Sequence, residues 1–438
     1  MNDKSSAITS LFNYALAILQ REIFVHLINI LTGVVIARTL GPEMLGIWVI
    51  LTLVSAYAEG FGRLKTDISS VYILGSQKVR EEVIFFSTSL FAIVSSLAIV
   101  AIIFWQLDFL ESLFFKSSST NYREELVWII LLIPFEFLLV NLSYFFIALE
   151  NILFYNRIKV LQSVLNFFLM VFLIIILDLS LWALVIARIF STVIPLIYAW
   201  NNLERDNWIR FFDRWDRSIT IEILKYALNF YVIGIVGTIH RLTIKSIGAI
   251  SLSTSQLAFF NQGEAGSRLL NVISNSISVI LYPKISKSDE NEFSIEISLT
   301  SFRVSFILLM FTGLLLFLIA DPLIIFLYGI DFEQSAEVLK IAIPGIVIGS
   351  SCLSLQPFFE GVGKADMIPK LQVVPVILQI FFAYLLIDAL GLLGASISFS
   401  LGYALYGFVI LIAFLKINKL SLYKIMPQLQ DIKLIYNI

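Results

Sequence analysis

Charged residues, cysteine and histidine are all scarce in this chain of 438 residues. Charged side chains make up 14% of it and hydrophobic residues 59%, whereas an average soluble protein is about 25% charged. The one cysteine, Cys352, excludes a disulfide framework and a cysteine-based metal cluster. The two histidines, His26 and His240, cannot form a metal site alone. The formal net charge of −2 gives no sign of a nucleic-acid partner.

Catalytic and nucleotide-binding motifs are missing as well. The run Gly361-Val362-Gly363-Lys364-Ala365 resembles a phosphate-binding loop, but Phe358 stands where that motif has its first glycine. Ala365 also stands where the motif has serine or threonine. The HExxH and GxSxG patterns do not occur. We therefore expect a protein that is not an enzyme, does not hydrolyse ATP and holds neither a metal nor another cofactor.

Long apolar runs dominate the chain. Each is close to the ~20 residues with which an α-helix crosses a bilayer, and the backbone in lipid must satisfy its own hydrogen bonds, which requires helices. Residues 1–10 lack the basic region and cleavage site of a signal peptide, so the first span is expected to act as an uncleaved signal. The sequence predicts an all-α membrane protein of about 12 transmembrane helices, at 11–37, 43–61, 83–105, 126–148, 158–178, 181–200, 224–247, 256–281, 299–320, 336–356, 367–387 and 391–415. The segment 321–329 is expected to dip into the interface without crossing.

Lysine and arginine are unevenly distributed between the predicted loops. With the N-terminus inside, 20 of them fall in inner segments, Arg157 and Lys159 among them, and 4 fall in outer segments. Because short cytoplasmic loops of membrane proteins carry the excess of basic residues, both termini are predicted to be cytoplasmic. The four outer residues are Arg38, Lys116, Arg123 and Lys340.

The two halves of the sequence show an ordered series of matches. Glu59 and Arg63 match Glu264 and Arg268, both as Glu-x-x-x-Arg. Six spans per half leave both halves in the same orientation, which predicts a parallel repeat around a central cavity. We expect an N-terminal lobe at 1–200, a cytoplasmic linker at 201–223, a C-terminal lobe at 224–416 and a cytoplasmic tail at 417–438. The other matches are Arg38–Gly41 with Lys245–Gly248, Glu150 with Glu360, Leu161-Gln162 with Leu371-Gln372, and Asp178 with Asp388.

Ionisable residues inside membrane spans are expensive and normally face the protein interior or a wet cavity. Six basic residues lie within the predicted spans, against four acidic ones, so the interior is predicted to be basic. Arg21 stands beside Glu22, which leaves the helix on another side and is therefore expected to neutralise Arg21 poorly. Arg188 could form a structural pair with Glu136. The basic set is Arg21, Arg188, Arg241, Lys245, Arg268 and Arg303, and the acidic set is Glu22, Glu59, Glu136 and Glu264.

The predicted eighth span carries the most informative polar pattern. Its polar residues recur at spacings of three and four, which places them on one face of a helix. Such a face either lines a water-filled cavity or forms hydrogen bonds to neighbouring helices. Lys245, in the seventh span, could instead snorkel to the outer interface. The predicted cavity residues are Arg21, Arg241, Lys245, Asn261, Glu264, Arg268, Asn271 and Asn275, and the candidates for ion coupling are Glu59, Glu136 and Asp388.

One segment resembles a known family. Ala37-Arg38-Thr39-Leu40-Gly41-Pro42-Glu43-Met44-Leu45-Gly46 is similar to the first-loop signature of bacterial O-antigen and polysaccharide flippases. These belong to the multidrug/oligosaccharidyl-lipid/polysaccharide exporter superfamily. Later segments are similar to that family in the same order, namely Leu281-Tyr282-Pro283-Lys284-Ile285-Ser286, Leu327-Tyr328-Gly329 with Asp331-Phe332, Gly361-Val362-Gly363-Lys364, and Gly394-Ala395.

The resemblance covers nearly the whole chain and implies two six-helix lobes. It implies transport of undecaprenyl-diphosphate-linked oligosaccharide, such as an O-antigen unit for lipopolysaccharide biosynthesis, across the inner membrane. Membrane lipids, a polysaccharide polymerase and a chain-length regulator are the further partners that it implies. The basic cavities of the family carry over to Arg21, Arg241, Lys245 and Arg268 by their position on spans one, seven and eight.

Three other functions compete with this interpretation. A multidrug exporter of the same superfamily would need interior carboxylates for cationic drugs, which the basic interior disfavours. A polymerase enzyme would be expected to have a long outer loop, whereas the longest here is about 106–125. A scaffold would leave the charges in the spans unexplained. The sequence leaves Na⁺, H⁺ and the membrane potential open as the driving force of transport.

Overall fold

The computed structural model describes residues 2–76, 81–115, 121–205, 216–286, 291–426 and 428, and the secondary structure of these residues is helical without a strand. Ten helical stretches of this described part are long and apolar enough to cross a membrane. The prediction of an all-α, multi-pass membrane protein is confirmed. The predicted linker at 201–223 and tail at 417–438 lie partly outside the described residues, at 206–215, 427 and 429–438.

The first two predicted spans form one kinked helix, α1 (Asn2–Gly62). Its apolar part, Gln20–Gly62, has 43 residues, which at 1.5 Å each is about 65 Å, twice the thickness of a bilayer core. Gly41 interrupts the helix with φ 74° and ψ 180°, a conformation that glycine adopts without steric cost. Pro42 follows at the start of the next helical stretch, where its missing N–H costs nothing. The kink therefore separates two lengths that can each cross.

The single helix predicted for 256–281 is wrong. The structure has two helices there, α9 (Thr254–Arg268) and α10 (Asn271–Ser286). Between them the backbone N–H groups of Leu269 and Leu270 donate three residues back, to Gly266 and Ser267, instead of four. This tighter turn changes the angular step of the helix, so the predicted spacing of three and four residues does not place all of the polar residues on one face. With the kink in α1, this break accounts for ten long stretches where about twelve were predicted.

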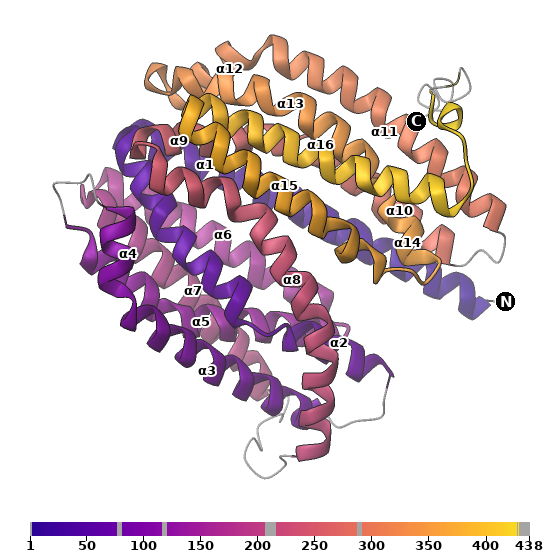
Figure 1. Ribbon diagram of the computed structural model, residues 1–438. Coiled ribbons are helices and arrows are strands. Elements are labelled where there is room, and N and C mark those ends of the chain that lie inside the picture. Colours follow the sequence, from indigo (N-terminus) through magenta and orange to yellow (C-terminus); the bar gives the residue numbers. More distant parts are fainter. Residues whose placement is uncertain are drawn as a thin grey trace. The chain divides into compact units, whose positions relative to one another are not determined.

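The first compact unit is Met1–Thr238. Helices α3, α5 and α7 pack side by side in it, and α6 packs against α7 and α1 (Figure 1). Phe85, Leu142, Phe145 and Phe154 are buried at the centre of one of its apolar clusters. The predicted pair at 158–178 and 181–200 is present as two helices. The elements after α1 are α2 (Thr66–Ser76), α3 (Glu81–Trp105), α4 (Leu107–Phe114), α5 (Arg123–Ala148), α6 (Ile152–Ile175), α7 (Ser180–Arg205) and the first part of α8 (Arg217–Ser251).

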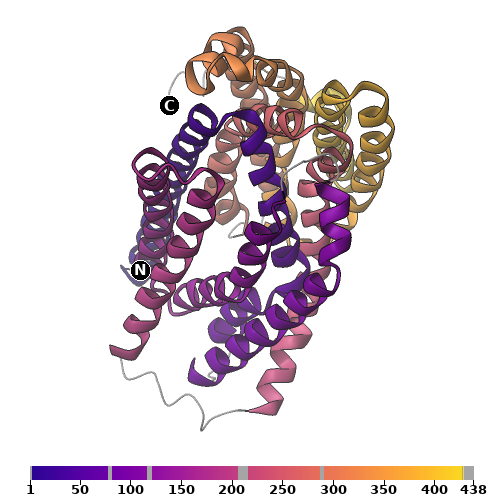
Figure 2. The same ribbon diagram turned by 90° about the vertical axis from the view of Figure 1, so that its left-hand side faces the viewer.

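The second compact unit is Ile239–Ile438. Helices α15 and α16 run side by side as an antiparallel pair in both views (Figure 2). Helices α13 and α16 approach closely because Gly345 faces the backbone of Ser400, leaving no room for a side chain. The elements after α9 and α10 are α11 (Asn291–Leu318), α12 (Ala320–Tyr328), η1 (Ile330–Phe332), α13 (Glu333–Leu353), α14 (Gln356–Gly361), α15 (Met367–Leu390), α16 (Leu392–Ile417) and η2 (Leu422–Ile425).

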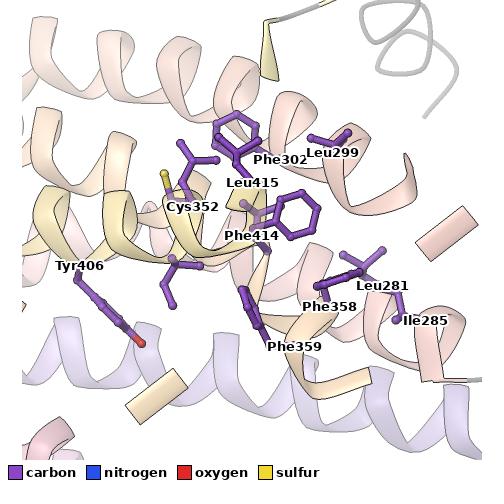
Figure 3. Packing of buried hydrophobic residues seen from close by; sticks show 13 residues of the cluster. Leu281, Ile285, Leu299, Phe302, Cys352, Phe358, Phe359, Tyr406, Phe414 and Leu415 are labelled. Carbon is purple, nitrogen blue, oxygen red and sulfur yellow. The ribbon is translucent and has the colours of Figure 1, made fainter. Parts of the chain in front are cut away.

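An aromatic cluster connects α10, α14 and α16 in this unit. Phe358 of α14 meets Phe414 of α16 edge to face, with ring centroids 4.9 Å apart. Leu281 and Ile285 of α10 complete the packing around Phe358 and Phe359 (Figure 3). Burying these side chains stabilises the arrangement by roughly 1.5–3 kcal/mol each. The cluster thereby holds α10 against the helices that carry the polar site.

The boundary between the units lies inside α8, at Thr238, and not in the predicted linker at 201–223. In the first unit, the Tyr231 hydroxyl donates a hydrogen bond to the Phe61 carbonyl of α1 at 2.6 Å. In the second unit, Lys245 of α8 forms an ion pair with Glu264 of α9. The two ends of one helix are thus each bound to a different unit.

Two short helices occupy corresponding places in the two units. In the first, Arg123 at the start of α5 bonds to Asp108 and Glu111 of α4, both at 2.7 Å. In the second, Lys340 of α13 bonds to Asp321 of α12. Helix α12 has nine residues and is about 14 Å long, too short to cross a bilayer. The order long helix, short helix, long helix therefore occurs in both units, as α3–α4–α5 and α11–α12–α13.

Candidate functional site

Glu264 is the centre of a buried ion cluster in the second unit. It lies on α9 and is 2% exposed. Its Oε2 is 2.9 Å from Nζ of Lys245 on α8. Its Oε1 accepts from Nη2 and Nε of Arg268 at 2.7 and 2.9 Å. One carboxylate faces two cations, so the cluster has one positive charge in excess.

The turn between α8 and α9 brings these residues together. Ser253 begins α9 with a capping box, in which its Oγ accepts from the Gln256 N–H and its own N–H donates to Gln256 Oε1, both at 3.2 Å. Such a box satisfies two backbone donors that the start of a helix would leave free. Because α8 ends at Ser251, the cap reverses the chain within two residues. Lys245, before the turn, then lies against Glu264, after it.

Tyr403 of α16 extends the cluster toward a third helix. Its hydroxyl accepts from Arg268 Nη1 at 3.2 Å and from Asn271 Nδ2 at 3.4 Å. The Arg268 guanidinium carbon also lies 5.6 Å from the centroids of both the Tyr403 and the Phe399 rings. The sequence analysis missed Tyr403, because one tyrosine in an apolar span has no spacing pattern to mark it.

The predicted cavity residues of this unit divide into two groups. Glu264, Arg268, Lys245 and Asn271 converge as described, and Asn271 Oδ1 also accepts from Ser350 of α13. The other three stand apart from this convergence. Asn261 bonds to its neighbour Gln262 at 3.3 Å, Asn275 is exposed on α10, and Arg241 is exposed on α8. The continuous polar stripe predicted for one helix face is therefore replaced by a cluster on α8, α9, α10 and α16.

The first unit holds a polar pocket of about 400 Å³. Three cations and one carboxylate line it, so it too is basic. Glu136 of α5 and Arg188 of α7 pair across it, with Nη2–Oε1 2.7 Å and Nε–Oε1 2.9 Å, as the sequence suggested. The charged lining residues are Arg21, Glu136, Lys159 and Arg188, and the uncharged polar ones are Asn29, Thr32, Trp48, Gln162, Ser163, Asn166, Ser191 and Thr192.

Arg21 is buried in α1 and has two contacts beyond the pocket. Its Nη2 bonds to Glu22 Oε1 at 2.8 Å, although adjacent residues leave a helix in different directions. The expectation that Glu22 leaves Arg21 unneutralised is wrong, because both side chains are long enough to bend toward each other. The Tyr155 ring lies under the guanidinium, 4.9 Å from its carbon, a cation–π arrangement.

Lys159 was assigned to a cytoplasmic loop by sequence and instead lines this pocket. Helix α6 begins at Ile152, so Lys159 is two turns inside it. The local signal that could have revealed this is Asn151, whose side chain accepts from the Phe154 N–H and caps the helix.

The candidates for ion coupling occupy different surroundings. Glu136 lies in the pocket but is paired with Arg188. Glu59 is half-exposed and pairs with Arg63, which also lies 3.0 Å from Asp67. Asp388 is exposed near the end of α15. Arg303, counted among the interior cations, donates to the Lys424 carbonyl and so binds the C-terminal segment to α11.

Comparison with known families identifies the group to which the chain is related. A family model described as "Polysaccharide biosynthesis protein" matches residues 35–337, more than half of the chain. The chain belongs to this family. The match includes the segment at 37–46 that carried the sequence resemblance, and the resemblance is confirmed. A search of curated protein sequences finds no match for this family member.

Solved structures show which fold this polysaccharide biosynthesis protein has. The lipid II flippase MurJ in an inward closed conformation has a TM-score of 0.75 at 13% identity, covering 94% of this chain and 89% of its own. An inward-facing multidrug resistance MATE family transporter of the MOP superfamily has a TM-score of 0.70 at 16% identity, covering 91% and 96%. The Vibrio cholerae MATE transporter VcmN in its bent form has a TM-score of 0.61 at 15% identity, covering 95% and 98%. The chain therefore has the same fold as these flippase and transporter structures.

Proposed function

We propose that the protein is a flippase that moves undecaprenyl-diphosphate-linked oligosaccharide across the bacterial inner membrane by alternating access. The cargo would be an O-antigen unit or a related polysaccharide repeat. The fold that it shares with MurJ and the MATE transporters, and its membership of the polysaccharide biosynthesis family, support this class of function. The observation that carries the cargo assignment is the excess of cations around the buried Glu264.

Arg268 is the residue best suited to hold the diphosphate. Its planar guanidinium can bind two phosphate oxygens at once, and such charge-assisted bonds are about twice as strong as neutral ones. Its Nη2 and Nε are bonded to Glu264, which holds the side chain in place. A diphosphate would compete with Glu264 for Arg268. Glu264 would then keep Lys245 as its partner, so the carboxylate would not be left alone.

The pocket of the first unit supports the same class of cargo independently. Arg21, Lys159 and Arg188 line it together with Glu136, and Glu22 pairs with Arg21 from outside the lining. One cation remains in excess, which favours an anionic ligand. The amide and hydroxyl groups around them offer the donors and acceptors that sugar hydroxyls require. Trp48 adds a flat apolar surface of the kind on which a sugar ring can pack.

The alternative is a multidrug exporter of the same superfamily. Cationic drugs would need an available interior carboxylate, but Glu264 and Glu136 are each paired with arginine. The proposal includes two six-helix lobes around a central cavity, cytoplasmic termini, and a polysaccharide polymerase and chain-length regulator as partners. Transport would be driven by Na⁺, H⁺ or the membrane potential rather than by a bound cofactor.

The test measures which ligand binds and whether Arg268 is required. The full chain in nanodiscs is titrated with undecaprenyl-diphospho-N-acetylglucosamine and, separately, with the cationic dye ethidium. We expect the lipid to bind at least tenfold more tightly than the dye. Arg268→Ala should abolish lipid binding, and Arg268→Lys should restore it only in part, because lysine keeps the charge but loses the planar fork.

Arg123→Ala is the matched control, because Arg123 also bonds to carboxylates but lies outside both polar sites. It should bind the lipid like the wild type. In cells, surface glycan is measured together with the amount of protein in the membrane. Export at the wild-type level by well-expressed Arg268→Ala, or tight binding of the dye without binding of the lipid, would contradict the proposal.

A further inference from the structure

His240 is a buried histidine with an unused nitrogen. It lies on α8 and is 8% exposed, and its Nδ1 has no hydrogen-bond partner. Gln379 of α15 is 1% exposed and hydrogen-bonds to the imidazole. A buried polar atom without a partner is rare and costs free energy. The Nδ1 of His240 therefore marks a place that can take up a proton.

His240 lies close to the ion cluster of Glu264. The Tyr403 ring connects them, since its centroid is 5.8 Å from the imidazole centroid and 5.6 Å from the guanidinium carbon of Arg268. Tyr406 of α16 packs against the other part of the imidazole, with centroids 5.5 Å apart. The charged groups that act on the imidazole are Arg268 from α9 and Arg241 from α8 itself, while Gln379 from α15 is uncharged. The charged groups around the imidazole are therefore positive.

We propose that His240 is a proton-binding site linked to the anion site at Arg268, so that loading of the diphosphate cargo is accompanied by uptake of one proton on the imidazole. This inference rests on the proposed function, because it needs an anionic ligand at Arg268. Without cargo, burial disfavours a proton on His240, and the charges of Arg268 and Arg241 repel it as well. A bound diphosphate offsets that repulsion, and the hydrogen bond with Gln379 favours the protonated imidazole.

Charge balance gives the physical reason for the linkage. Lys245, Arg268 and Glu264 together carry one positive charge, and a diphosphate diester carries two negative ones. Arg241 is exposed and stands outside this cluster. A proton on His240 therefore makes the loaded cluster neutral, and a neutral group costs far less to hold away from water than a charged one. By thermodynamic linkage, cargo must favour the proton as much as the proton favours cargo.

The chain is well suited to a test because it contains only two histidines, the residues whose ordinary titration falls between pH 5 and 8. Binding of undecaprenyl-diphospho-N-acetylglucosamine to the full chain in nanodiscs is measured from pH 5.5 to 8. The diphosphate diester of this probe does not itself titrate in that range. We expect the affinity to rise as the pH falls, approaching tenfold per unit between the pH at which the cargo-free imidazole titrates and the higher pH at which the loaded one titrates.

His240→Gln should remove this slope, and His240→Asn provides a second variant if the first does not fold. His26→Gln is the matched control, since His26 is a half-exposed residue of α1 outside the pocket lining. It should keep the wild-type slope. Calorimetry of the wild type in buffers of different ionisation enthalpy should count about one proton taken up per lipid bound, and about none for His240→Gln.

The outcomes separate the two proposals. Tight binding with no pH dependence and no proton uptake in the wild type overturns the role of His240 and leaves the flippase intact. A slope that persists in His240→Gln overturns it as well. A uniform loss of affinity at every pH, with the slope retained, would assign His240 a structural role only. No binding at any pH in the wild type overturns both.

Discussion

Glu264→Gln is the substitution whose effect the structure predicts most directly. The change keeps the size of the side chain and removes its charge. Glu264 is the shared partner of Lys245 and Arg268, at 2.9 and 2.7 Å. Its side chain is 3% exposed, whereas those of Lys245 and Arg268 are 23% and 31% exposed. The substitution therefore leaves two cations near each other without a carboxylate between them.

The magnitude follows from this difference in burial. Removing one member of a fully buried ion pair costs about 3–5 kcal/mol. The side chains of Lys245 and Arg268 are partly exposed, so we expect a smaller loss of stability, about 2–3 kcal/mol. Arg268→Ala should cost less, because Glu264 then keeps Lys245. Glu264→Gln should therefore lose more stability than Arg268→Ala. Arg268→Ala should lose more cargo binding, because Arg268 is the residue proposed to bind the diphosphate.

Thermal unfolding of the purified protein in one detergent measures this loss. Glu264→Gln should lower Tm by several degrees and Arg268→Ala by less. Asp366→Asn makes the same carboxylate-to-amide change in the exposed pair with Lys370. An exposed ion pair adds little stability, so this control variant should have the Tm of the wild type. If Glu264→Gln also has the Tm of the wild type, the ion cluster does not stabilise the packing of α8 against α9.

Two further predictions concern packing and topology. Gly345→Ala should destabilise the protein by about 1–3 kcal/mol, because a Cβ there would overlap the Ser400 carbonyl group of α16. Gly237→Ala should be neutral or slightly stabilising, because nothing lies within 4 Å of its Cβ position, and the same melting assay compares the two. Reporter fusions after Asp213 and after Ser286 should report the cytoplasm, and a fusion after Ser119 the periplasm, because basic residues are concentrated in the predicted inner segments. A cytoplasmic signal at Ser119 would show that the span count of the first half is wrong.

The sequence by itself determined the fold class and the local pairs. Apolar runs of about 20 residues must become helices in lipid, because the backbone has no other way to satisfy its hydrogen bonds. The sequence predicts two repeated pairs, Glu59 with Arg63 and Glu264 with Arg268. Both pairs form salt bridges in the structure. A spacing of four residues is enough for this, since it places two side chains on the same helix face.

Only the tertiary structure decided which helices share a polar site. Lys245 reaches Glu264 through the capped turn at Ser253, and Tyr403 reaches Arg268 from 135 residues away. Lys159 enters a pocket because α6 begins earlier than its hydropathy suggests. Hydropathy cannot supply these partners, because a face that contacts lipid and a face that contacts another helix are both apolar. The partners of each buried charge are chosen by close packing between helices, which depends on shape and is not encoded in any local spacing.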